Sequence, residues 1–248
     1  MRRWSLALVL AVVAGSLLAG CQTTQDKARD LAARAQANAP KPLVITKPNR
    51  DVRVVDTTLL SDQNGDAIVV TLKNEGKDTL INVPIVVDLH TGKKSVYRND
   101  EAGLEPALNH VSAIGPGETV DWVNDQVNPI SKPDSAKVKV GLPDAPAPSK
   151  LPEIAVSPPR LQNSSLGPKA AGTVTNQSQV DQLKLVLFAV ARSGGRVVAA
   201  GRGGVKKLKA GDGHAYSLFF IGDPSGGDVT VTAPPTTFQT GGPDGTAD

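Results

Sequence analysis

Along most of this chain, apolar residues alternate with polar ones or gather in short valine-rich runs, and glycine, proline or asparagine separates the runs. This pattern predicts β-strands, because a strand places successive side chains on opposite faces and favours β-branched residues. The Asn64-Gly65 pair between the first two runs predicts a tight hairpin. In the first half of the chain we expect strands at 51–60, 67–74, 80–89, 95–98, 119–123 and 136–140.

The chain contains two strand-rich stretches that correspond to each other. Thr71–Asn74 matches Thr173–Asn176 at a spacing of 102 residues, whereas Pro116–Glu118 matches Ala210–Asp212 at a spacing of 94. An eight-residue insertion in the first stretch, at a loop expected at Asp100–Asn109, accounts for the change in spacing. Duplication of a whole domain explains this order better than chance similarity between valine-rich strands does.

The second stretch carries strand and turn motifs in a particular order. They are Gly172–Asn176, the long apolar run Leu183–Val190, Gly194–Val198, Leu208–Asp212 and Tyr216–Phe220. This order resembles the FxLyD-type and related immunoglobulin-like domains of bacterial envelope proteins. The first stretch fits more loosely, and the motif that names the family is reduced to Leu187-Phe188-Ala189-Val190. The resemblance implies an all-β chain of two tandem immunoglobulin-like β-sandwiches, and a fold alone implies no activity.

The N-terminus reads as an export signal. Two arginines precede an apolar run that is well short of the roughly 20 residues needed to span a membrane. The end of this region resembles the lipobox of bacterial lipoproteins, here Leu18, Ala19, Gly20 and Cys21. The resemblance implies cleavage before Cys21, a diacylglycerol on its thiol and anchoring to a membrane through lipid. An ordinary secretory signal followed by a chance cysteine is the simpler alternative.

The segments between these features complete the expected organisation. The stretch after Cys21 is rich in alanine and charged residues, which predicts a flexible or marginally helical stalk that ends at Pro40 and Pro42. The whole chain then comprises a signal peptide (1–20), a stalk (21–42), a first sandwich (43–142), a proline-rich linker (143–152), a second sandwich (153–238) and a disordered tail (239–248).

Composition excludes some classes of function. Loss of the signal peptide removes Arg2 and Arg3, which leaves 25 basic against 24 acidic residues and a net charge of +1. A nearly neutral chain does not favour nucleic acid as a partner. Cys21 is the only cysteine, so no intramolecular disulfide can form. Only eight aromatic residues occur, fewer than a sugar-binding platform or ligand cleft usually uses.

No residue pattern predicts catalysis, a metal or a cofactor. His90, His110 and His214 have no metal-ligand spacing, and no Gly-x-Ser-x-Gly, His-Glu-x-x-His or P-loop motif occurs. Asp62, Asn64 and Asp66 alternate as the ligands of a calcium loop do. The twelfth position of that loop, where a bidentate glutamate is required, is Lys73. We interpret these residues as a hairpin turn.

Charge is distributed unevenly between the two stretches. Residues 43–145 carry 11 basic and 15 acidic side chains, whereas residues 150–238 carry 10 basic and five acidic ones. The Gly-rich, basic stretch at 201–207 suggests contact with an anionic partner through Arg202, Lys206 and Lys207. A solvated hairpin, or docking of one sandwich on the other, would explain the same charges.

We therefore expect a non-enzymatic envelope lipoprotein that acts as an interaction or assembly module. Its partners would be the membrane, through Cys21, and an envelope protein or anionic envelope polymer. Gln22 replaces the aspartate that marks inner-membrane retention in some two-membrane bacteria. The expected location is thus the periplasmic side of the outer membrane, or the outer face of the cell membrane in a one-membrane host. A ligand-binding accessory of a transporter is the alternative, and a hydrolase would need His, Asp and Ser side chains clustered in space.

Overall fold

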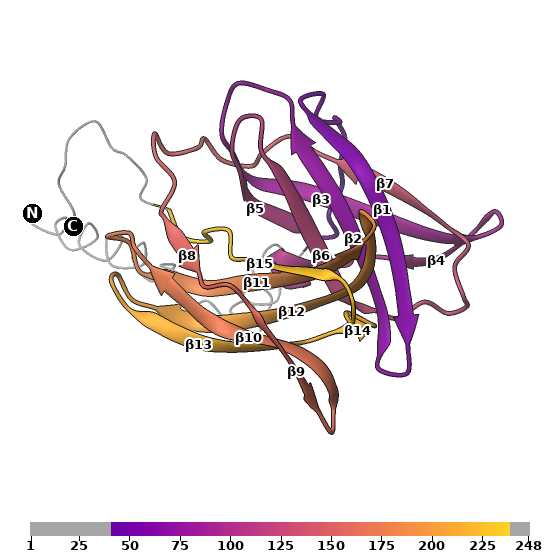
Figure 1. Ribbon diagram of the computed structural model, residues 1–248. Helices are drawn as coiled ribbons and strands as arrows, with labels where there is room; N and C mark the ends of the chain where they lie inside the picture. The colour runs from indigo at the N-terminus through magenta and orange to yellow at the C-terminus, as the bar shows by residue number, and fades with distance from the viewer. Residues whose placement is uncertain (1–40, 239–248) are drawn as a thin grey trace, which may run out of the picture. The chain divides into compact units, whose positions relative to one another are not determined.

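The computed structural model describes residues 41–238 (Figure 1). The expected signal peptide, lipidation site and tail lie outside the described residues, as does nearly all of the stalk. Within this range, the residues from Pro42 onward form one compact unit. Its regular structure within the described range is antiparallel β-strand with one short 3₁₀ turn, η1 (Pro106–Leu108). The expected all-β class is confirmed, and no helix in this range is long and apolar enough to cross a membrane.

The strands fall into two groups, which we call the N-terminal repeat (β1–β7) and the C-terminal repeat (β8–β15). Those of the N-terminal repeat are β1 (Val52–Asp62), β2 (Gly65–Asn74), β3 (Leu80–Thr91), β4 (Lys94–Arg98), β5 (His110–Ile114), β6 (Thr119–Val127) and β7 (Ser135–Val140). Those of the C-terminal repeat are β8 (Ile154–Val156), β9 (Arg160–Ser164), β10 (Gly167–Asn176), β11 (Gln182–Ser193), β12 (Arg196–Leu208), β13 (Gly213–Phe219), β14 (Ile221–Gly222) and β15 (Asp228–Thr232).

Both repeats pair their strands in the same way. In the N-terminal repeat, β2 lies between β1 and β6 in one sheet, and β3 lies between β7 on one side and β4 and β5 on the other. In the C-terminal repeat, β10 lies between β13 on one side and β8 and β9 on the other, and β11 lies between β12 and β15. This shared connectivity supports the duplication predicted from the sequence.

Two local breaks account for the differences between the repeats. The unbroken strand β12 of the C-terminal repeat corresponds to β4 and β5 of the N-terminal repeat, which residues 99–109 separate. The insertion predicted from the change in spacing therefore interrupts one strand. Conversely, the long strand β1 corresponds to β8 and β9, which are separated at Pro158 and Pro159. Proline ends the pairing because it has no amide N–H to donate.

Two buried asparagines make matching bonds in the two repeats. Asn74 and Asn176 are both fully buried. The Nδ2 of Asn74 donates to the carbonyls of Asp78 and Gly115, while its Oδ1 accepts the N–H of Gly76. The Nδ2 of Asn176 donates to Val180 and Leu208, and its Oδ1 accepts the N–H of Ser178. In each repeat the amide thus satisfies main-chain groups where the strand ends, which a buried polar group requires.

The apolar core of each repeat lies between its two sheets. Trp122 of β6 is 1 % exposed and packs with β2 and β3, while its Nε1 donates to the carbonyl of Ala107 in η1. Leu185 and Leu187 of β11 and Tyr216 and Leu218 of β13 fill the second core. Each repeat is therefore a pair of sheets packed face to face.

Candidate functional site

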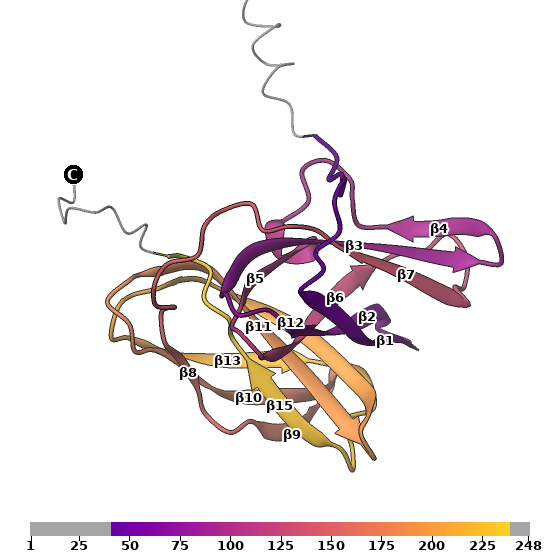
Figure 2. The ribbon, with the colours of Figure 1, turned by 90° about the horizontal axis from the view of Figure 1, so that it is seen from above.

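The two repeats pack against each other through sheet faces that point away from their own cores (Figures 1 and 2). Alternate residues of β2 and β6, including Val69 and Val123, are buried against β11 and β12. Val190 of β11 and Ala200 of β12 belong to the same apolar cluster as those two valines. As a result, both faces of β2 are buried, and the apolar core of the N-terminal repeat continues into the contact with the C-terminal repeat.

An ion pair, Arg192–Asp121, lies at one side of this junction. The guanidinium donates from Nη1 and Nη2 to the two carboxylate oxygens, at 2.8 and 2.7 Å. The hydroxyl of Thr71 also donates to Asp121, at 2.7 Å. The pKa of Arg192 is raised, chiefly because its guanidinium donates to Asp121. This two-point bond fixes β11 against β2 and β6 in one orientation.

A second ion pair, Arg202–Asp125, lies farther along β6 and joins it to β12. Arg202 Nε donates to Asp125 Oδ1 at 3.1 Å, and its Nη1 lies 3.6 Å from Glu105 Oε2. The Arg202 side chain is only 7 % exposed. This side chain faces the N-terminal repeat, so it is not on the exposed surface where an anionic partner was expected to bind.

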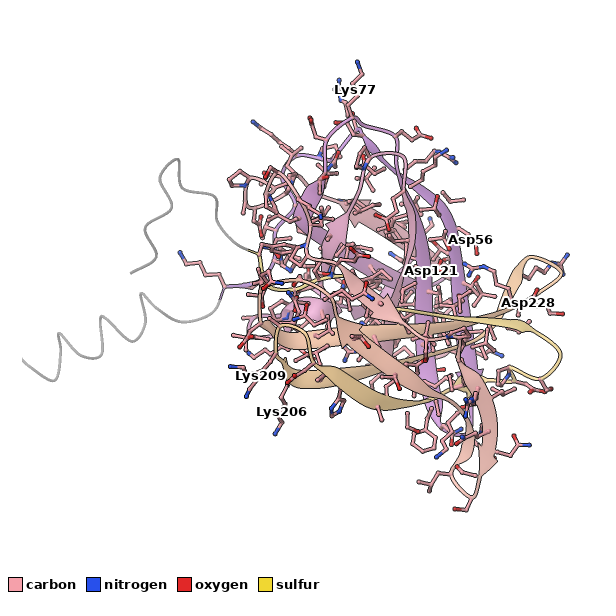
Figure 3. All side chains as sticks on the ribbon, turned by 60° about the vertical axis from the view of Figure 1, so that its left-hand side comes forward. Asp56, Lys77, Asp121, Lys206, Lys209 and Asp228 are labelled. Atoms are coloured by element: carbon pink, nitrogen blue, oxygen red, sulfur yellow. The ribbon has the colours of Figure 1, made fainter. Side chains whose placement is uncertain are left out.

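Lys206 and Lys207 differ from Arg202 because both residues are exposed. Lys207 forms a 2.8 Å pair with Asp181, in which both side chains are about half exposed. In Figure 3, Lys206 and Lys209 project well away from Asp56, Asp121 and Asp228. The sequence analysis treated Arg202, Lys206 and Lys207 as one site. In the fold, Arg202 is buried at the junction, whereas the two lysines are exposed near the C-terminal end of β12.

An open groove of about 790 Å³ runs along the junction and continues the contact between the repeats. Strands β5, β6, β8 and β15 line its sides, together with Leu151 and Pro152 of the linker and Pro234 and Pro235 after β15, and β2 and β11 contribute further residues. Its floor includes Phe188 and the Arg192–Asp121 pair. Most of the lining is apolar, with Val111, Val120, Ile154, Val156 and Val231 among its members.

The four strands β5, β6, β8 and β15 are all edge strands. In their sheets β5 pairs with β3 alone, β6 with β2, β8 with β10 and β15 with β11. An edge strand leaves one side of its backbone without a ladder partner. The groove therefore combines an apolar lining with free backbone donors and acceptors.

Negative charge predominates around one part of the groove. Glu118 and Asp121 line it with Arg192, and Arg192 is also opposite Asp228 in the β11–β15 ladder. Asp56, which is opposite Thr71 in the β1–β2 ladder, contributes a further charge near Arg192. One guanidinium thus faces an excess of carboxylates, three of which are labelled in Figure 3.

The buried histidine His90 on β3 lies close to a carboxylate and a hydroxyl group. Its Nε2 lies 3.2 Å from Asp88 Oδ1, and the hydroxyl of Ser95 donates to that same oxygen at 2.6 Å. Burial acts to raise the pKa of Asp88, but the bond from Ser95 and the charges of Arg98 and His90 lower it overall. In a hydrolytic triad the histidine must accept the serine proton, and here the serine contacts the carboxylate instead.

The other two histidines lie apart from each other and from His90. His110 bonds Asn109 and lies 3.2 Å from Asp144, whereas His214 is exposed on β13. Within residues 41–238, no three side chains form a group that could hold a metal ion.

The expected hairpin turn at Asn64-Gly65 is confirmed. Asp62 Oδ1 accepts the N–H of Asn64, and β1 and β2 pair as neighbours up to Asp62 and Gly65. Asp62 Oδ2 also accepts the N–H of Gly222, at 2.8 Å, so this turn contacts the C-terminal repeat.

Comparison with known proteins gives no family for this chain. No protein-family model matches it, and no curated protein is a significant sequence match.

Proposed function

We propose that this chain is a membrane-anchored bacterial envelope lipoprotein, with two immunoglobulin-like β-sandwiches that act as a non-enzymatic interaction or assembly module. The lipobox resemblance at Leu18–Cys21 supports the anchor. The shared strand connectivity of the two repeats supports the immunoglobulin-like assignment. The proposed location is extracytoplasmic: the periplasmic side of the outer membrane in a two-membrane host, and otherwise the outer face of the cell membrane.

The observation that carries the interaction role is the groove at the junction. The two ion pairs hold the repeats in one arrangement, so the groove is formed before any partner binds. A preformed surface loses less conformational entropy on binding than one that must first become ordered. Edge strands along an apolar groove suit recognition of another polypeptide.

Affinity capture from intact envelopes tests this role. Lipidated protein would be cross-linked in living cells and purified with its neighbours, and an equally anchored protein with the domain replaced would be the control. We expect at least one envelope protein or polymer to be enriched only with the intact domain. Equal recovery from both samples would contradict an interaction role.

Replacing Cys21 with alanine should abolish lipid anchoring. The thiol that accepts the diacylglycerol is lost, so the protein should be recovered from the soluble fraction or as uncleaved precursor. Membrane fractionation and intact-mass measurement check this, with the neighbouring Gln22→Ala substitution as a control that keeps the thiol. An unmodified Cys21 in protein from the native host would rule out the lipoprotein assignment.

A ligand-binding accessory of a transporter is a second candidate, favoured by a small pocket that shares Phe188 with the groove. This pocket of about 210 Å³ lies where the insertion of the N-terminal repeat meets β11. Glu105, His110, Ser112 and Lys184 provide polar groups over an apolar floor that includes Phe188. Such a mixture fits a small molecule better than a polymer. Retention of a small molecule in native mass spectra of protein purified from its host would favour this candidate.

A further inference from the structure

We propose that the groove at the junction binds an extended strand of a partner protein, one that alternates apolar side chains with polar ones and carries a lysine or arginine. The inference rests on the proposed interaction role and specifies its site and the chemistry of its partner. Strand addition to a sheet edge would supply the backbone bonds, and the groove lining would select the side chains.

The backbone of β6 shows which groups would pair. Asn74 N–H donates to the carbonyl of Glu118, and β2 then pairs in register with β6 through Leu72 and Val120. In an antiparallel ladder, the main-chain N–H and C=O groups of one residue bond the partner strand, and those of the next residue point away from that strand. The main-chain groups of Thr119 and Asp121 therefore point away from β2, and both residues line the groove.

The lining explains why the occupant would be an extended chain. The apolar residues come from five separate strands, so they form a long surface rather than one enclosed cavity. Thr230 and Thr232 of β15, both exposed, add hydroxyl groups along the opposite side. A strand with side chains on alternating faces can place apolar groups on the lining and polar groups toward water.

Charge complementarity indicates a basic residue in the partner. Arg192 is already bonded to both oxygens of Asp121. The exposed Glu118 uses Oε2 to accept the N–H of Gly115, at 2.6 Å, and retains acceptor capacity on its other oxygen. Lys73 is opposite Thr119 in the β2–β6 ladder, and Asp56 and Asp228 lie close to Arg192. Four carboxylates therefore face two cations, and the remaining negative charge would attract a lysine in the bound strand.

A peptide-binding measurement tests the proposal directly. The probe is a fluorescent eight-residue peptide that alternates valine with lysine and threonine, and its partner probe has the same side chains with alternate backbone nitrogens methylated. We expect the first peptide to bind the protein in an anisotropy titration and the methylated one to bind at least about tenfold more weakly, because it has lost backbone donors. Equal binding of both peptides, or binding of neither, would overturn the proposal.

Protein variants locate the binding to this groove. Thr119→Pro removes the outward N–H at the first residue of an edge strand, where proline is tolerated. We expect it to weaken the lysine peptide at least about tenfold. The control is Gly213→Pro, because Gly213 begins the corresponding strand β13 of the C-terminal repeat and does not line the groove. Equal loss with both variants, at unchanged melting temperature, would place the binding elsewhere.

Glu118→Gln tests the charge while its amide oxygen can still accept the Gly115 N–H. This substitution should weaken binding of the lysine-containing peptide about threefold at low salt. It should leave unchanged the binding of a peptide in which threonine replaces each lysine. A change of oligomeric state in Thr119→Pro would instead identify a second copy of this chain as the occupant. If no peptide binds but envelope capture is unaffected by Thr119→Pro, the interaction role stands and only the strand-binding groove fails.

Discussion

Replacing Gly201 with alanine should destabilise the protein by more than about 4 kcal/mol. Gly201 lies on β12, where the strand crosses close to the end of β13. A Cβ atom there would lie 1.9 Å from the carbonyl oxygen of Phe219 and 2.9 Å from its carbonyl carbon. Both are main-chain atoms, so no side-chain rotation can relieve the overlap, and the two sheets of the C-terminal repeat would have to separate.

The same strand supplies a matched control for this substitution. A Cβ atom at Gly204 would meet only the carbonyl oxygen of Leu185, at the ordinary contact distance of 3.7 Å. Gly204→Ala should therefore change stability by less than about 1 kcal/mol. Urea denaturation of the two variants compares them, and similar midpoints would show that β12 and β13 can move apart at little cost.

Arg202→Gln should cost about 2 kcal/mol of folding stability, whereas Lys206→Gln should cost less than about 0.5 kcal/mol. Removing the guanidinium leaves Asp125, with 23 % of its side chain exposed, without its cation inside the junction. That partial exposure, and the 44 % exposure of Glu105, keep the expected cost below that of a fully buried pair. Lys206 is exposed and has no such partner among the ion pairs of residues 41–238.

Chemical denaturation measures both effects, and the Asp125→Asn partner variant completes a double-mutant cycle. Strictly additive losses would show that Arg202 and Asp125 do not stabilise each other. The anionic-partner hypothesis has its own readout: if Lys206 and Lys207 contact such a partner, their replacement by glutamine should reduce salt-sensitive sedimentation with anionic vesicles without lowering the melting temperature.

The strands could be predicted from the sequence where the local signal was strong. Alternation and turn residues gave the positions of β1 to β4, and the Asn64-Gly65 hairpin formed as expected. The strand β5 was not assigned, because its five residues follow a loop and begin with a polar histidine. The strand β9 was not assigned either, since its residues are all exposed and follow two prolines. β9 carries no apolar pattern, whereas the apolar residues of β5, Val111, Ala113 and Ile114, form a run too short to be assigned next to the turn that follows it.

The candidate site could not be predicted, because it is formed by residues that are distant in sequence. Asp121 and Arg192 are 71 positions apart and come from different repeats. The charge difference between the two stretches suggested docking of one on the other as an alternative. The position of Arg202 at the junction shows that docking explains part of the basic excess. Nothing local distinguishes Arg202, which is buried, from the exposed Lys206 four positions later, because burial here depends on the neighbouring repeat.

The way the repeats pack has a consequence for polymerisation. The face built on β2 and β6 of one repeat meets the face built on β11 and β12 of the other, and these are not equivalent faces. Such a head-to-tail contact does not close on itself, so it could in principle continue from copy to copy as a filament. At the growing end, however, Ala215 and Phe219 of the C-terminal repeat occupy the positions that Asp121 and Asp125 hold in the N-terminal one. The arginines of an incoming copy are also already bonded to Asp121 and Asp125 inside its own junction. The two ion pairs that hold the repeats together therefore cannot be repeated between copies, and the series ends after two units.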